Sequence, residues 1–395
     1  MKKGWEVKKL GEICTIERGS SPRPIDNFIT SDSSGYNWIK IGDTKNINKY
    51  LYSTKERITI EGTKKSRYVK KGDLILSNSM SYGKAFILQT DGFIHDGWFV
   101  LRLPENINTE FLFYAFSSPN VNEQIIKLSS GSVVKNISSD LVKKVDIPIP
   151  PLPEQKRIVE ILDKAFAEID KAKANAEKNL KNAKELFDSY LNNMLEKNKH
   201  LCKSLGNVCE RVEYGSAKKS KSKGIVPVLR MVNIQNGKFD WNNLVYSDNE
   251  EDNSKYLLRY NDVLFNRTNS PELVGKTAIY KGEMKAIFAG YLIRIHRKET
   301  LLDADYLNYY LNSEMAINYG KTVVISSVNQ ANINGTKLKS YPIPLPPLKE
   351  QQSIVQKLDE LSAVTKKIEE TYKKQIEKLE ELKKSILKKA FKGEL

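Results

Sequence analysis

Two long stretches of the chain carry apolar residues at alternating steps of three and four. The first stripe comprises Ile158, Leu162, Ala165, Ile169, Ala172, Ala176, Leu180, Ala183, Phe187, Tyr190 and Met194. The second comprises Ile354, Leu358, Leu361, Thr365, Ile368, Tyr372, Ile376 and Leu379. This spacing is typical of a coiled-coil seam. Each stretch therefore predicts one helix of roughly 40 to 45 residues, about 60 to 70 Å long at ~1.5 Å per residue.

Both stripes contain the same irregularity. Two successive steps of four occur at Ala172, Ala176 and Leu180, and again 196 residues later at Ile368, Tyr372 and Ile376. A shared irregularity at a shared place indicates that the two helices pack by one geometry. A long helix with a single apolar stripe needs a partner, and the other helix is the nearest candidate. The pair is expected to be antiparallel, because the second helix starts from the globular region to which the first delivers the chain.

A duplicated segment stands at the start of each predicted helix. Residues 147–163 read IPIPPLPEQKRIVEILD and residues 343–359 read IPLPPLKEQQSIVQKLD, with eleven of the seventeen positions identical. This similarity identifies an internal repeat. The prolines predict extended connectors, because proline cannot continue a helix or occupy a central strand. Glu154 and Glu350 then place negative charge at the positive end of each helix dipole.

The regions before each duplicated segment show short apolar or alternating runs, which predict strands. These runs are Trp38–Ile41, Leu74–Leu76, Phe99–Leu103, Val228–Val232, Val263–Phe265 and Leu292–Ile295. Turn signals such as Asn236-Gly237 separate them. One helix is expected near 109–118 and another near 303–313.

The predicted fold class is therefore α+β, with two similar globular domains separated along the chain by two long antiparallel coiled-coil helices in a pseudo-two-fold internal repeat. The globular domains are expected at 1–146 and 201–342. Each is followed by a Pro-rich linker and a long helix, at 147–200 and 343–395. Two separated contact regions would suit a rod-shaped partner, such as two major-groove segments of a DNA duplex.

The composition indicates a polyanionic partner. Lys and Arg number 64 and Asp and Glu 48, for a formal net charge of +16. Such an excess attracts DNA, RNA or an anionic membrane surface, although a lysine-rich soluble protein without such a partner remains an alternative. The chain has neither a stretch of ~18 uninterrupted apolar residues nor an apolar run at its start. Nucleic acid is therefore the favoured partner, and no membrane is expected.

The cysteines argue against a disulfide framework or a zinc site. Cys14, Cys202 and Cys209 are odd in number and form no CxxC pair. A reducing, cytoplasmic location is expected.

Polar stretches interrupt the predicted strands at corresponding places in the two globular domains. Arg, Lys, Asn and Gln can hydrogen-bond base edges, while Ser, Thr and Lys serve phosphates. The candidate DNA-binding residues are Arg18, Ser20, Arg23, Lys40, Asn78, Ser81, Tyr82, Lys84, Lys135, Ser216, Lys218, Lys219, Arg230, Asn266, Arg267, Thr268, Asn269, Asn329 and Gln330. Ordinary solvated loops are the alternative interpretation. The two domains differ most in these stretches, as expected if each reads a different base sequence.

Catalytic motifs are not expected in this chain. Gly275-Lys276-Thr277 and Gly320-Lys321-Thr322 resemble the end of a P-loop, but Ser270 and Met315 stand where its first glycine is required. No HExxH motif occurs, and His95, His200 and His296 are scattered. No GxGxxG follows a predicted strand. We therefore expect no catalytic residue and no metal site, although a nuclease site of scattered carboxylates is not excluded.

The duplicated Pro-Pro-Leu-x-Glu-Gln segments resemble those of the specificity (S) subunits of type I restriction-modification systems, the HsdS family. The resemblance covers nearly the whole chain and includes residues 5–13, 38–43, 72–75 and 390–395. The second globular domain departs from the pattern. It lacks the opening tryptophan, and it has Arg230-Met231-Val232-Asn233 where the first has Lys40-Ile41-Gly42-Asp43.

The resemblance implies that each globular domain is a target recognition domain that reads one half of a bipartite site in double-stranded DNA. The helices would set the spacing and dock two methyltransferase (M) subunits, which would modify adenine with S-adenosylmethionine. With restriction and motor (R) subunits added, the complex would cleave DNA using ATP and Mg²⁺. This chain would be non-catalytic, would hold none of these cofactors, and would lie in the cytoplasm at the nucleoid.

Two other function classes are left open by the sequence. One is a single-chain nuclease or methyltransferase. The other is a coiled-coil interaction protein whose positive charge is incidental.

Overall fold

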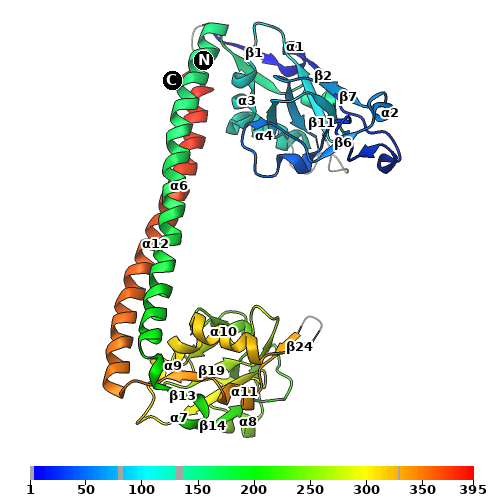
Figure 1. Ribbon diagram of the computed structural model, residues 1–395. Helices are drawn as coiled ribbons and strands as arrows, with labels where there is room; N and C mark the ends of the chain where they lie inside the picture. The colour runs from blue at the N-terminus through cyan, green and yellow to red at the C-terminus, as the bar shows by residue number, and fades with distance from the viewer. Residues whose placement is uncertain (1–3, 79–82, 130–136, 328–329) are drawn as a thin grey trace. The chain divides into compact units, whose positions relative to one another are not determined.

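The computed structural model describes residues 4–78, 83–129, 137–327 and 330–395 (Figure 1). The chain forms two compact units. Unit 1 contains residues 1–176 and 374–395, and unit 2 contains residues 177–373. Each unit consists of a mixed helix-and-strand region, called its head, and parts of both long helices.

The head of unit 1 contains two sheets and a strand pair. The first sheet has the order β2 (Thr15–Arg18), β11 (Trp98–Arg102), β8 (Leu74–Ser77), β9 (Ala85–Leu88) and β5 (Tyr50–Leu51). The second has the order β3 (Ile29–Thr30), β6 (Glu56–Ile58), β4 (Tyr36–Ile39), β10 (Gly92–Ile94) and β7 (Arg67–Val69). Strand β1 (Glu6–Lys9) pairs antiparallel with β12 (Asp146–Ile149).

The head of unit 2 repeats this topology. Its first sheet has the order β14 (Cys209–Tyr214), β23 (Leu292–Arg297), β19 (Val263–Asn266) and β21 (Thr277–Ile279), and its second the order β18 (Val245–Ser247), β15 (Val226–Leu229) and β22 (Ile287–Phe288). Strand β13 (Cys202–Ser204) pairs with β26 (Pro342–Pro344), as β1 pairs with β12. The remaining strands are the hairpin β16 (Ile234–Gln235) and β17 (Lys238–Phe239), and a small sheet of β20 (Thr268–Asn269), β25 (Gln330–Asn332) and β24 (Ile325–Ser327).

The predicted turn at Asn236-Gly237 closes the β16–β17 hairpin. Both residues have positive φ, 50° for Asn236 and 75° for Gly237, as a tight hairpin turn requires.

Short helices complete each head. Unit 1 has α1 (Leu10–Ile13), α2 (Ile60–Thr63), α3 (Thr109–Ser117), α4 (Pro119–Ser129) and α5 (Ser139–Val142), and unit 2 has α7 (Leu205–Val208), α8 (Glu250–Lys255), α9 (Ala304–Leu311), α10 (Glu314–Val323) and α11 (Gly335–Lys339). The sequence predicted α3 and α9 but not α4 and α10, which follow them directly. In α4, Val121 and Ile125 are buried one turn apart among polar residues.

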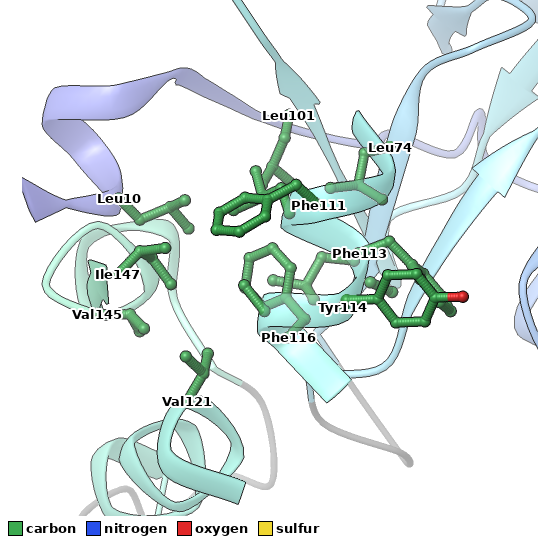
Figure 2. Packing of buried hydrophobic residues seen from close by; sticks show 14 of the residues in the cluster. Leu10, Leu74, Leu101, Phe111, Phe113, Tyr114, Phe116, Val121, Val145 and Ile147 are labelled. Atoms are coloured by element: carbon green, nitrogen blue, oxygen red, sulfur yellow. The ribbon is translucent and has the colours of Figure 1, made fainter. Parts of the chain in front are cut away.

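The core of unit 1 lies where α3 meets the first sheet. Figure 2 shows Phe111, Phe113, Tyr114 and Phe116 of α3 gathered with apolar side chains that include Leu74. The same cluster extends into the long helices through Ile158, Leu162, Leu387 and Ala390, and includes Phe391 directly after α12. The rings of Phe111 and Phe391 lie 5.1 Å apart between centroids. The ends of both long helices are therefore anchored in this core.

The core of unit 2 is built in the same way. Buried side chains of α9, such as Tyr306 and Tyr310, pack with Leu195 and with Ile354 and Leu358 of the long helices.

The long helices are α6 (Leu152–Lys197), of 46 residues, and α12 (Leu348–Ala390), of 43 residues. In unit 1 the first part of α6 lies beside the last part of α12, where the Lys173 and Glu380 side chains are 2.6 Å apart and Lys383 pairs with Asp170. In unit 2 the last part of α6 shares a core with the first part of α12. The predicted antiparallel pair and the α+β class with its internal repeat are confirmed.

The predicted seam residues occupy two environments. Ile158, Leu162, Ile169, Ile354 and Leu358 are buried. Leu180, Ile368 and Leu379 are partly exposed. The predicted boundaries of the two globular domains and the two linker-helix segments stay a prediction. The two compact units do not test them, because each unit contains part of both long helices.

Candidate nucleic-acid interface

Three candidate residues of unit 1 gather around Asp96, in the turn between β10 and β11. Arg18 donates from Nε to the Asp96 carbonyl oxygen at 3.2 Å. Asn78 donates from Nδ2 to the same oxygen at 2.9 Å. Arg23 lies 3.6 Å from the Asp96 carboxylate and keeps 82% of its side chain exposed. Positions far apart in the sequence are thus brought to one place.

Asp96 was not singled out in the sequence, although the Asp96-Gly97 dipeptide is a turn signal. Burial raises the pKa of its carboxyl, but a 2.7 Å hydrogen bond from Ser21 and the charges of His95 and Arg23 outweigh that effect. The net pKa is below the ordinary value. The Asp96 carboxylate therefore contacts Ser21 and Arg23, while its backbone carbonyl accepts from Arg18.

Asn78 occupies a buried position at the end of β8. Its side chain is 1% exposed, and its Oδ1 has no hydrogen-bond partner among the described residues. Its backbone carbonyl accepts from the Ile137 amide at 3.0 Å. The end of β8 is thereby joined to the start of the segment at Ile137.

The remaining described candidates of unit 1 lie near the same sheets. Ser20 donates to the Lys65 carbonyl at 2.9 Å. Lys40 pairs with Glu56. Lys84 is exposed at the start of β9. The candidates Ser81, Tyr82 and Lys135 in unit 1, and Asn329 in unit 2, lie outside the described residues.

Unit 2 joins its corresponding segments in the same way. The Arg267 carbonyl accepts from the Ile333 amide at 2.9 Å, as Asn78 accepts from Ile137. Thr268 and Asn269 form β20, which pairs with β25, the strand that begins at Gln330. The polar stretches at 266–270 and 330–332 of unit 2 are therefore neighbours.

Arg267 is held on two sides. Its Nε donates to the Gly290 carbonyl at 3.0 Å, and its guanidinium lies 5.0 Å from the centre of the Tyr214 ring. Tyr214 in turn accepts from the Gly335 amide at 2.8 Å. These contacts fix the position of the Arg267 guanidinium beside β20.

The other candidate DNA-binding residues of unit 2 differ in how far their side chains are exposed to solvent. Ser216, Asn266 and Thr268 are buried, whereas Lys218 and Lys219 are exposed. Lys218 donates to Asn249 Oδ1 at 3.0 Å. Arg230 donates to the Asn243 carbonyl at 2.7 Å, at the end of β15. The candidates of unit 2 therefore comprise exposed lysines, partly buried arginines and buried polar groups.

The apparent P-loop endings have the wrong structure for a phosphate cradle. Gly275-Lys276-Thr277 leads into strand β21, and Gly320-Lys321-Thr322 lies in the last turns of α10. Neither stands at a helix N-terminus, where a phosphate would be bound. Within the described ranges, no cluster of three or more His, Cys, Asp or Glu side chains could hold a metal ion. In the same part of the chain, no helix has the length and apolar character needed to cross a membrane.

The family model of the type I restriction modification DNA specificity domain matches the chain twice, over residues 2–181 and 197–378. The type I restriction enzyme EcoKI specificity subunit of Escherichia coli (strain K12) is 26% identical, over 99% of this chain and 89% of that protein. The StySPI specificity subunit of Salmonella potsdam is also 26% identical, over the same shares of the two chains.

Two solved structures share the fold over the full chain. One, from a study of complex assembly and conformational transition of a type I restriction-modification system, has a TM-score of 0.81 at 21% identity and is covered over 99% of its length. The other, the HsdS subunit from Thermoanaerobacter tengcongensis, has a TM-score of 0.59 at 20% identity and is covered over 98% of its length.

The two matches of the family model coincide with the two repeats of the fold. Specificity subunits are the non-catalytic recognition components of type I restriction enzymes, so the prediction of a non-catalytic chain is confirmed. The chain belongs to the family of type I restriction-modification specificity subunits, with two target recognition domains.

Proposed function

We propose that the two heads read the two halves of a bipartite site in double-stranded DNA. The observation that carries this proposal is the duplication of one head fold with different polar segments at the same place. Two domains with the same fold but different polar segments are suited to recognise two different base sequences. The net charge of +16 favours contact with the phosphate backbone.

Within each head, the exposed cations near the joined segments are the proposed contacts to DNA. Arg23 in unit 1 and Lys218 and Lys219 in unit 2 can reach phosphates or base edges. Buried residues such as Asn78 and Asn266 would support the neighbouring loops from below. Rigid support improves discrimination, because side chains that are held in place lose less entropy on binding.

The long helices are proposed to set the length of unread DNA between the half-sites and to dock two methyltransferase subunits. Restriction and motor subunits would complete the complex. S-adenosylmethionine, ATP and Mg²⁺ would then be bound by these partner subunits and not by this chain.

Footprinting of the full chain with its methyltransferase subunits tests the proposal. Two protected blocks at constant separation are expected, with an affinity that falls steeply as salt rises. One contiguous protected block would contradict bipartite reading. An affinity independent of salt would contradict backbone contact by the basic side chains.

A further inference from the structure

Each head is tied to its long helix by the glutamine of the duplicated Pro-rich segment. In unit 1, Gln155 is 1% exposed. Its Oε1 accepts from the Asn108 amide at 2.8 Å. Its Nε2 donates to the Pro150 carbonyl at 2.9 Å and to the Asn106 carbonyl at 3.2 Å. One planar amide thus joins the start of α6, the connector before it and the loop before α3.

Unit 2 repeats these three bonds with different neighbours. Gln351 is fully buried. Its Oε1 accepts from the Asp303 amide at 2.9 Å, and its Nε2 donates to the carbonyls of Pro346 at 2.9 Å and Leu301 at 2.8 Å. The same geometry is therefore kept although the surrounding loop sequences differ.

The residue that bonds each glutamine also caps the head helix. The Asn108 side chain accepts from the Phe111 amide at the start of α3. The Asp303 side chain accepts from the Tyr306 amide at the start of α9. The head helix and the long helix therefore share one anchor residue.

A second tie lies eight residues further along each long helix. The Tyr114 hydroxyl of α3 donates to Asp163 of α6, and the Tyr309 hydroxyl of α9 donates to Asp359 of α12. Eight residues of helix span about 12 Å at ~1.5 Å per residue. Two ties at different points along the helix, added to the shared apolar core, restrict the tilt between the head and the long helix more than one tie would.

We propose that these glutamine and tyrosine–aspartate ties form a clamp in each unit, which fixes the angle between head and long helix and thereby sets the spacing of half-sites that the chain accepts. Gln155, Tyr114 and Asp163 make up the clamp of unit 1, and Gln351, Tyr309 and Asp359 that of unit 2. This inference rests on the proposed bipartite reading. The clamp residues act as positioning residues, because their bonds are all internal to the protein.

Spacing selectivity of the full chain in complex with its methyltransferase subunits tests the clamp. Duplexes would carry both half-sites with the spacer changed in single base-pair steps. The double variant Gln351→Met, Tyr309→Phe keeps side-chain size but removes the bonds of both ties. Its preference for the native spacer is expected to fall at least about tenfold, while discrimination within each half-site changes by less than about twofold.

Gln352→Ala is the matched control, because Gln352 is the exposed neighbour of Gln351 on the same helix turn. It is expected to keep the wild-type spacing preference. If the double variant fails to fold in thermal unfolding, Tyr309→Phe alone decides the question, with an expected loss of preference of about threefold.

Two results would overturn the clamp while bipartite reading stands. One is a folded double variant with the wild-type spacing preference. The other is an equal loss of half-site discrimination and spacing preference, which indicates general damage to the head. A wild-type chain without any spacing preference would instead refute the proposed function.

Discussion

At the scale of single residues, each head is braced by an arginine between two carboxylates, and this arginine is buried in unit 2 but 32% exposed in unit 1. Arg294 bonds Glu213 at 2.6 Å and Asp262 at 2.9 Å. Arg102 of unit 1 bonds Glu17 at 3.1 Å and also pairs with Asp73. Both arginines lie on central strands, β11 and β23, and bond carboxylates at equivalent places. The arginines themselves differ in register by two residues, because Val100 of β11 faces Glu17 whereas Arg294 of β23 faces Glu213. The two heads therefore share a polar brace as well as a topology.

Removal of this arginine should destabilise unit 2. Arg294→Met leaves Glu213 and Asp262 without their shared cation in a mostly buried place, a change that costs about 3 to 5 kcal/mol in comparable pairs. Faster amide hydrogen exchange in peptides of β14 and β23 would report the loss. Arg211→Met, at an exposed position of β14, should leave that exchange unchanged. Equal exchange in both variants would contradict the brace.

The same brace predicts an acid-sensitive contribution to stability. Burial raises the pKa of Glu213, but hydrogen bonds from Arg294 and His296 outweigh burial and hold it below its ordinary value of 4.5. The unfolded chain therefore takes up the proton first, and unit 2 loses stability as pH falls below about 4.5. Thermal midpoints measured against pH should fall less steeply for Glu213→Gln than for the wild type. If the thermal midpoints of Glu213→Gln and the wild type fall equally steeply with pH, Glu213 does not contribute to the acid sensitivity.

The sequence predicted the kinds of candidate residue but not their exposure. Asn78, Asn266, Thr268 and Ser216 were chosen because their side chains can bond bases or phosphates, yet all four are buried. Exposure depends on which turn packs over a strand end, and in unit 1 that turn contains Asp96, 18 residues away from Asn78. Such contacts between distant segments are not visible in local patterns.

At the scale of elements, periodicity predicted most of what packs into a core. Both long helices and the runs around Leu74, Phe99, Val263 and Leu292 appear as expected, because burial imposes a regular spacing of apolar residues. The run at Val228–Val232 ends early, since Met231–Asn233 form a 3₁₀ turn.

The Pro-rich connectors hold more structure than the sequence indicated. Their first residues form β12 and β26, which pair with β1 and β13 at the beginning of each repeat. Proline fits there because each of these strands has a single partner in its pair. The pairing joins residues about 140 positions apart, which a local reading of the sequence cannot detect.

Insertion of one heptad in each long helix tests their role as a spacer. Seven residues would be added after Ala176 in α6 and after Lys373 in α12, where each helix passes from one unit to the other. The heptad keeps the seam in phase and adds about 10 Å. The accepted spacer should lengthen by about three base pairs, at ~3.4 Å per pair, with both half-sites unchanged. Retention of the original spacer in methylation assays would contradict a rigid spacer.

At the scale of the whole molecule, the chain has the features of a duplication followed by divergence. The frame is shared by both units: the strand order, the arginine brace and the glutamine tie. The polar segments carried by that frame differ between the units. A shared fold that carries different polar segments is what a protein needs to recognise two different half-sites.

Mapping of adenine methylation in a genome that carries this chain with its methyltransferase subunits tests bipartite reading most directly. We expect a motif of two short specified blocks, separated by a run of unread bases of one constant length. Exchange of the head of unit 2 for that of a relative should change one block and leave the other intact. A single contiguous motif, or an unread run of variable length, would contradict the account.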